Sequence, residues 1–155
     1  MINYLSHYTD YTDQTNKELA DMRNLLDSSL DVICSFDHEG RFLYASKAAK
    51  RMWGYEPEEI IGTLYMDLVH PDDHPKTIAA AEAIISGINV TNFDNRYLKK
   101  DGTLIPIVWS ATWDMDKQVM NCIAKDATEK KQLEQSLNKS RLMFESFMNN
   151  APFVA

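Results

Sequence analysis

The side chains best suited to metal binding or proton transfer lie together in the segment His70-Pro71-Asp72-Asp73-His74. Two imidazoles and two carboxylates so close together are the donor set of a metal site or an acid–base pair. The same segment suits the start of a helix, because proline fits the first helical position and acidic side chains favour the positive end of the helix dipole. Since no distant Cys or His cluster completes a ligand set, the sequence favours the helix start and predicts neither a metal site nor a catalytic residue.

Composition excludes several classes of function. The 155 residues are enough for one domain with a buried core. Residues 1–40 carry a charge of -6 out of the net -7, and the rest of the chain has no basic stripe, so nucleic-acid binding is not expected. No apolar run is long enough to span a bilayer, and the N-terminal segment is not a secretory signal. The expected compartment is therefore the cytoplasm.

Hydrophobic periodicity predicts the elements that position these residues. Residues 1–16 are polar and are expected to form a loose leader, and apolar spacings of three and four predict a helix over 17–30. Helices are then expected to begin at Ser46, as a cap, at Pro57 and near His70. Strands are predicted at 32–36, 41–44, 92–98, 104–113 and 118–125. Two strands, a helical block and three more strands predict an α+β domain, with an antiparallel sheet and helices on one face.

A last helix is predicted over residues 128–150. Its apolar stripe is narrow and contains Leu133, Leu137, Phe144 and Phe147. Such a stripe favours a coiled coil with a partner, and the alternative is a helix that folds back on its own sheet. Residues 147–155 also repeat the pattern of 25–33, so 151–155 are expected to begin a further domain, unless the match is a coincidence.

Taken together, these segments resemble the PAS sensory domain with its C-terminal PAC portion, over about residues 23–131. The resemblance rests on an ordered set of motifs: the hairpin 31–44, Gly54-Tyr55, Glu58-Glu59-Ile60-Ile61-Gly62, His70-Pro71-Asp72-Asp73, Arg96-Tyr97-Leu98-Lys99-Lys100-Asp101-Gly102 and Asp126-Ala127-Thr128-Glu129-Lys130-Lys131. The match is most similar to PAS domains of bacterial and archaeal two-component sensor histidine kinases. It implies a PAS/PAC domain over 31–127 and a five-stranded antiparallel sheet in the order 2-1-5-4-3.

The resemblance also bears on cofactors. The photoreceptor subfamily's Gly-x-Asn-Cys-Arg-Phe-Leu segment is absent, so flavin photochemistry is not supported. Some members hold haem on a histidine of the long helix, but His74 lies in its first turn beside acids, so no haem is predicted. Cys34 and Cys122 fall on neighbouring strands, either as two reduced core residues or as a redox pair. A glycine that is common between the last two strands is missing.

The resemblance implies a ligand pocket between sheet and helices, although core packing explains each residue separately. Arg96 either clamps a ligand carboxylate or pairs with a surface acid. The candidate pocket residues are Ile84, Ile85, Phe93, Asn95, Arg96, Tyr97, Trp109, Ser110 and Trp113.

The junction Asp126, Thr128 and Glu129 is expected to cap the outgoing helix, with Glu129 reaching back as in a capping box. In the family this junction couples the sheet to the output helix. The expected function is therefore a sensory module that binds a small ligand or a partner and biases a coiled-coil connector. It would act as a homodimer through its flanking helices, and the output domain absent from this chain would most plausibly be a histidine kinase. The alternative is a ligand-free dimerisation module, and this chain itself is not expected to be an enzyme.

Overall fold

A computed structural model describes residues 2–152 of the chain. Five strands form one antiparallel sheet in the order β2-β1-β5-β4-β3, which confirms the predicted topology. The strands are β1 (Val32–Phe36), β2 (Phe42–Ala45), β3 (Val90–Leu98), β4 (Leu104–Asp114) and β5 (Val119–Asp126). The helices are α1 (Ile2–Ser28), α2 (Ala48–Trp53), α3 (Pro57–Ile60), α4 (His74–Ile85) and α5 (Thr128–Asn150), with short 3-10 turns at Tyr65–Asp67 and Pro71–Asp73.

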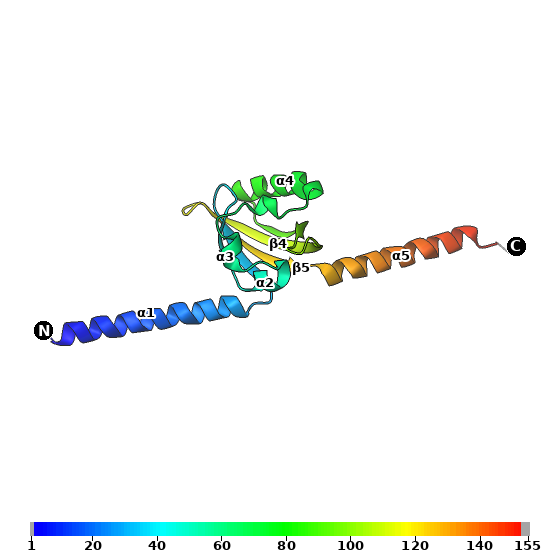
Figure 1. The fold of residues 1–155 in the computed structure, drawn as a ribbon. Helices are drawn as coiled ribbons and strands as arrows, with labels where there is room; N and C mark the ends of the chain where they lie inside the picture. Colours follow the sequence, from blue (N-terminus) through cyan, green and yellow to red (C-terminus); the bar gives the residue numbers. More distant parts are fainter. Residues whose placement is uncertain (1, 153–155) are drawn as a thin grey trace.

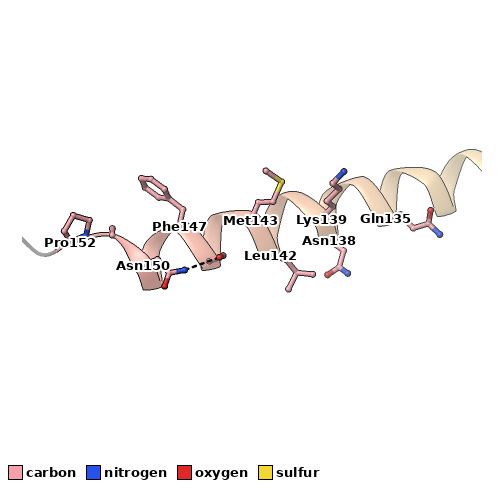
Figure 2. Close-up of a pocket in the computed structure, with 10 residues that line it drawn as sticks. Gln135, Asn138, Lys139, Leu142, Met143, Phe147, Asn150 and Pro152 are labelled. Carbon is pink, nitrogen blue, oxygen red and sulfur yellow. Dashed lines mark hydrogen bonds between the residues drawn. The ribbon is translucent and has the colours of Figure 1, made fainter.

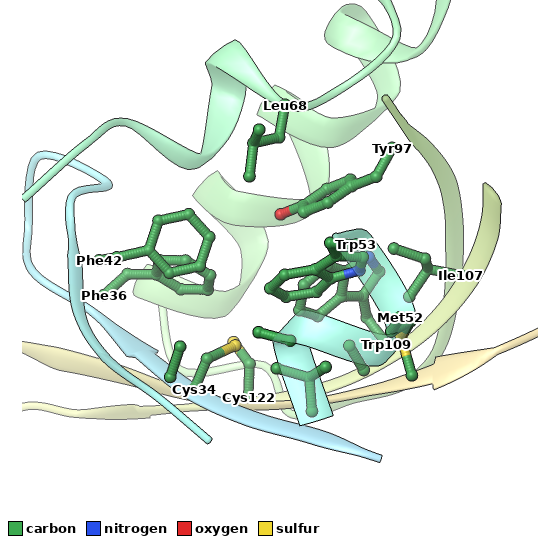
Figure 3. Packing of buried hydrophobic residues seen from close by; sticks show 14 of the residues in the cluster. Cys34, Phe36, Phe42, Met52, Trp53, Leu68, Tyr97, Ile107, Trp109 and Cys122 are labelled. Atoms are coloured by element: carbon green, nitrogen blue, oxygen red, sulfur yellow. The ribbon is translucent and has the colours of Figure 1, made fainter. Parts of the chain in front are cut away.

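Helices α2, α3 and α4 cover one face of the sheet, while α1 and α5 extend away from the domain in opposite directions (Figure 1). The core between the layers is an aromatic cluster. Trp53 of α2 is fully buried, and its ring centroid lies 5.1 Å from that of Tyr97 and 6.1 Å from that of Trp109 (Figure 3). Phe36 and Phe42 continue the cluster, with their ring centroids 4.7 Å apart. These large rings fix how far the helices stand from the sheet.

The predicted leader and the predicted start of the first helix are both wrong. From Ile2 onward the polar segment belongs to α1, which continues without a break to Ser28. Thr12 and Thr15 donate side-chain hydrogen bonds to the carbonyl oxygens of Tyr8 and Tyr11, one turn earlier, at 2.9 Å each. Their hydroxyl groups therefore do not compete with the backbone bonds of the helix.

Ser46 does not cap α2, contrary to the prediction. Its hydroxyl accepts a hydrogen bond from the backbone N–H of Ile33 at 3.0 Å, and its own N–H donates to the Ile33 carbonyl at 2.8 Å. The fully buried Ser46 therefore extends the pairing of β2 with β1, and α2 begins after Lys47. Pro57 does begin α3, as predicted, and Gly54 ends α2 with a positive φ of 85°.

Helix α5 projects from the end of β5 and does not fold back on the sheet (Figure 1). None of its residues is buried. The helix ends at Asn150. A further domain was predicted to begin at 151–155, and of these residues 153–155 lie outside the described residues. In the described part of the chain, no helix combines the length and the hydropathy needed to cross a membrane.

Candidate ligand cavity

An apolar cavity of about 40 Å³ lies between α4 and the covered face of the sheet. Its lining side chains come from β1, β3, β4, β5, α4 and the Tyr65 turn. They are Phe36, Tyr65, Thr77, Ala80, Ala81, Ile84, Phe93, Asn95, Tyr97, Trp109, Ala111, Met120 and Cys122. Each strand contributes every second residue, because successive side chains point to opposite faces of a sheet.

Five of the nine candidate pocket residues line this cavity: Ile84, Phe93, Asn95, Tyr97 and Trp109. The other four are displaced by simple geometry. Ile85 follows Ile84 on α4 and is 43% exposed, since one helical step turns it toward solvent. Ser110 and Arg96 each adjoin a lining residue on a strand, so they point to the other face. Trp113 is on the same face as Trp109, but it packs against the core beyond the cavity.

Most of the lining residues that were not predicted from the sequence are small side chains or alternate residues of the strands. Thr77, Ala81 and Ile84 recur at helical spacing on α4, so that spacing was an available signal for this wall. The same is true of the alternate residues Met120 and Cys122 on β5. Tyr65 belongs to a short turn whose contact with the cavity depends on tertiary packing alone, and no sequence pattern indicates it.

A chain of hydrogen bonds crosses the cavity wall from the sheet to α4. Trp109 Nε1 donates to Asn95 Oδ1 at 2.7 Å, and Asn95 Nδ2 donates to Thr77 Oγ1 at 3.2 Å. Thr77 Oγ1 in turn donates to the backbone carbonyl of Asp73 at 2.7 Å. An indole nitrogen can only donate, so it fixes which end of the Asn95 amide faces Trp109 and therefore the direction of the whole chain.

The carboxylate of Asp73 fixes the start of α4 to β3. Arg96 donates to it from Nε at 3.0 Å, from Nη2 at 2.8 Å and from its backbone N–H at 2.8 Å. The Arg96 guanidinium lowers the pKa of Asp73 to about 2. Of the two roles predicted for Arg96, the structure therefore shows the pairing with an acid.

The His-Asp cluster is a helix start, as the sequence favoured. His70 Nδ1 accepts a hydrogen bond from the Asp72 N–H at 3.1 Å, and His74 Nε2 lies 2.9 Å from the Val69 carbonyl oxygen. His74 does not line the cavity. Among residues 2–152, no group of three or more His, Cys, Asp or Glu side chains is arranged to hold a metal ion.

Cys34 and Cys122 are directly opposite one another on β1 and β5 and are free thiols. Figure 3 shows both on the core side of the sheet. Burial raises the pKa of both thiols, that of Cys122 to about 12, so both remain protonated. Burial also raises the pKa of the Tyr97 phenol, which is 1% exposed. The polar groups of the cavity wall are therefore uncharged.

Three contacts hold the junction between β5 and α5 in place. Asp126 Oδ1 accepts hydrogen bonds from the backbone N–H and the hydroxyl of Thr128, at 2.9 and 2.5 Å. The Ala127 N–H donates to the carbonyl oxygen of Pro106 on β4 at 2.9 Å. Lys131 Nζ of α5 lies 3.3 Å from Asp94 Oδ2 of β3. The Glu129 side chain forms none of the side-chain hydrogen bonds found in the described part of the chain, so its predicted capping-box role is wrong.

Asp94 also connects the junction between β5 and α5 to α4, the helix that covers the cavity. Its Oδ2 lies 3.6 Å from Lys76 Nζ of α4, as well as near Lys131. Partial burial raises the pKa of Asp94, but the two lysines outweigh that effect and the pKa is lowered. Asp94 lies between Phe93 and Asn95, which both line the cavity, so one strand segment contacts the cavity on one face and α5 on the other.

Within residues 2–152, the apolar stripe of α5 is not covered by another element. Leu133, Leu137, Phe144 and Phe147 are between 63% and 74% exposed. A broad open hollow of about 800 Å³ is lined by α5 together with Ala151 and Pro152. Figure 2 shows its lining side chains along α5, among them Met143 and Phe147. Because one helix supplies almost all of its walls, this hollow is an unpartnered helix surface and not a cavity.

Comparison with known proteins identifies the family. A family model described as PAS fold matches residues 42–124, more than half of the chain. The probable diguanylate cyclase DgcE of Escherichia coli is 32% identical over 89 residues, which are 57% of this chain and 8% of that protein. The chain thus spans a small part of this curated relative.

Two solved structures show the same fold. A domain of a sensory box sensor histidine kinase/response regulator from Geobacter sulfurreducens superposes with a TM-score of 0.61 at 22% identity, covering 70% of this chain and 94% of that one. The PAS-B domain of Drosophila melanogaster Cycle with bound ethylene glycol superposes with a TM-score of 0.53 at 24% identity, covering 61% and 96%. By its matched family model and its sheet order, the chain belongs to the PAS family of sensory domains, which occur in signalling proteins.

Proposed function

We propose that this chain is the sensory module of a cytoplasmic signalling protein, in which a small molecule in the cavity changes the position of α5. The observation that carries this proposal is the double role of β3. Phe93 and Asn95 line the cavity, and Asp94 between them pairs with Lys131 of α5. A ligand that displaces β3 would therefore also displace the attachment of the connector helix. A small movement of this kind is sufficient when the responding element has two packing arrangements.

The responding element is a two-fold dimer through α1 and α5. Both helices present exposed apolar stripes, among them Leu19 and Met22 on α1 and Leu133 and Leu137 on α5. The same stripe of a second copy can cover such a stripe in a symmetric dimer. The proposed output domain follows α5 and is a histidine kinase, and the alternative is a diguanylate cyclase, the class of the Escherichia coli relative.

The module would work without haem or flavin. The cavity of about 40 Å³ is far smaller than either ring system, and His74 is turned to a backbone carbonyl outside it. A small neutral molecule is a better match, and the Cycle PAS-B domain is described with ethylene glycol.

A matched pair of variants on α4 tests the coupling. Ala81 lines the cavity and Ala79 is exposed two positions away, so Ala81→Leu fills the cavity while Ala79→Leu is its control. Hydrogen exchange of residues 128–135 should change in Ala81→Leu and not in Ala79→Leu. Adding Asp126→Ala, which removes the carboxylate that accepts hydrogen bonds from Thr128, should abolish that difference. Unchanged exchange of α5 in Ala81→Leu would contradict the proposal.

The second candidate function is a dimerisation module that binds no ligand. The exposed stripes of α1 and α5 favour it, since they need a partner whether or not the cavity is occupied. Native mass spectrometry of protein purified from its own source separates the two functions. A small-molecule adduct supports the sensor, and an unliganded dimer supports the dimerisation module.

A further inference from the structure

The size of the cavity limits what it can hold. A buried water needs about 10–15 Å³ of cavity volume, so about 40 Å³ holds about three water-sized groups. A molecule of about three to five non-hydrogen atoms fills the same space. Large buried side chains such as Trp109 and Tyr97, which are 6% and 1% exposed, form part of the wall, so a much larger ligand would have to displace the core.

The chemistry of the wall excludes a charged ligand. No Asp, Glu, Lys or Arg side chain lines the cavity. The Asp73 carboxylate is held by Arg96 at the start of α4, and the hydrogen bond from Thr77 to Asp73 is to its backbone carbonyl and not to the carboxylate. Burial of an ion without a counter-charge is costly, so an anion or cation of this size would stay in water.

Two polar groups of the wall, the Tyr65 and Tyr97 hydroxyls, form none of the hydrogen bonds found within residues 2–152, and Tyr97 is the more deeply buried of the two. The Thr77 hydroxyl and the Asn95 amide are hydrogen-bonded to one another, and the Asn95 amide also accepts a hydrogen bond from Trp109. The Tyr97 hydroxyl takes part in none of the hydrogen bonds found within residues 2–152, although its side chain is 1% exposed and lines the cavity. Figure 3 shows this hydroxyl pointing away from β3, toward the side on which Phe36 and Phe42 lie. A buried phenol O–H is a donor that needs an acceptor.

We propose that the cavity binds an uncharged molecule of about three to five non-hydrogen atoms, a short-chain amide, ketone or alcohol, whose oxygen accepts a hydrogen bond from Tyr97. This inference rests on the proposed sensory function and names the class of ligand that the same site takes. The small hydrocarbon part of such a molecule would contact Ile84, Phe93 and Met120, while its oxygen would face the phenol. Both needs of the wall, apolar contact and one acceptor, are met by a single small molecule.

The test compares acetamide with acetate, two molecules of equal size and shape that differ in charge. The isotope-labelled chain is titrated with each while the Trp109 indole N–H and the Asn95 side-chain amide are followed by NMR. Acetamide and acetone should shift both signals in a saturable way, and acetate should bind at least about tenfold more weakly because it carries a charge. Benzamide, which is larger, should not bind.

Variants separate the polar contact from the cavity itself. Tyr97→Phe should weaken acetamide about fivefold, the effect of one hydrogen bond, without lowering the melting temperature, because the lost hydroxyl has no protein partner. Ala81→Leu should abolish binding of every probe, and Ala79→Leu should leave it unchanged.

Each outcome bears on one part of the inference. Equal binding of acetamide and acetate, or undiminished binding of acetamide to Tyr97→Phe, would overturn the ligand class and leave the sensory function standing. Binding of benzamide would overturn the size limit. If none of the probes binds, the ligand class is wrong, and the hydrogen-exchange comparison of Ala81→Leu with Ala79→Leu still decides whether the cavity is coupled to α5.

Discussion

The ion pair of Asp73 with Arg96 attaches the start of α4 to β3, and the variant Asp73→Asn measures how much this ion pair contributes to the free energy of unfolding. The Asp73 side chain is 7% exposed and accepts three hydrogen bonds from Arg96, two from the guanidinium and one from the backbone. Asparagine has nearly the same shape but carries no charge. We expect the free energy of unfolding to fall in this variant at neutral pH, because the guanidinium loses its counter-charge.

The magnitude follows from the pKa of Asp73, which Arg96 lowers from 3.8 to about 2. At about 1.4 kcal/mol per pKa unit, the carboxylate would contribute at most about 2.5 kcal/mol. Since the Arg96 side chain is 41% exposed, solvent screening reduces the expected loss to about 1–2 kcal/mol. The pKa is lower in the folded chain, so this contribution is present above about pH 4 and is lost as the pH falls through about 2.

Urea unfolding of the parent and of Asp73→Asn at about pH 7 and about pH 3 checks both the size and the sign of the effect. Asp72→Asn is the matched control, because the Asp72 side chain is 77% exposed and next in sequence. The stability gap for Asp73→Asn should narrow at the lower pH. An equal loss in both variants, or a gap that does not change with pH, would refute the assignment of this stability to the ion pair.

Three further results are expected. Gln118→Gly should raise the free energy of unfolding by about 0.5–1 kcal/mol in a denaturant titration, because Gln118 has a φ of 56° in a region that glycine adopts without strain; an unchanged stability would contradict this. Changing Leu133 and Leu137 together to Asp should weaken the dimer in sedimentation and leave the near-UV circular dichroism of the core intact, whereas unaltered sedimentation would mean that α5 is not the dimer contact. Cys34 and Cys122 should react with a thiol reagent only as the chain unfolds, since burial raises the pKa of both; fast reaction of the folded chain would revive the redox role.

The elements that could be predicted were those whose periodicity changes sharply along the chain. Strands β1 and β4 were predicted as β-prone runs, and most of their residues alternate in burial in the structure. Gly54 and Pro57 mark helix boundaries by backbone geometry alone. The N-terminal part of α1 could not be read in the same way, because an exposed helix needs no apolar face and its composition resembles that of a loop. Ser46 was misplaced for a related reason. A serine beside a helix is a frequent cap, and only the position of Ile33 shows that it is used elsewhere.

The candidate site shows which sequence rules were sufficient and which were not. Asn95 and Arg96 are adjacent on one strand, so alternation alone forbids both from lining one cavity; the same applies to Trp109 and Ser110. Applying that rule within each strand would have removed two of the four misplaced residues. The partner of Arg96 was not predictable, because Asp73 is 23 residues away and is brought to β3 only by the packing of α4.

The same alternation is the physical basis of the proposed coupling between the cavity and the helix outside the domain. On β3, Phe93, Asn95 and Tyr97 face the cavity, while Asp94 pairs with Lys131 and Arg96 pairs with Asp73. A stiff strand cannot move its inner side chains without moving the outer ones by a similar distance. Salt bridges at the surface contribute about 0–1 kcal/mol each. In the proposed dimer, a bias of that size at the base of α5 in both copies would change the ratio of two helix arrangements severalfold.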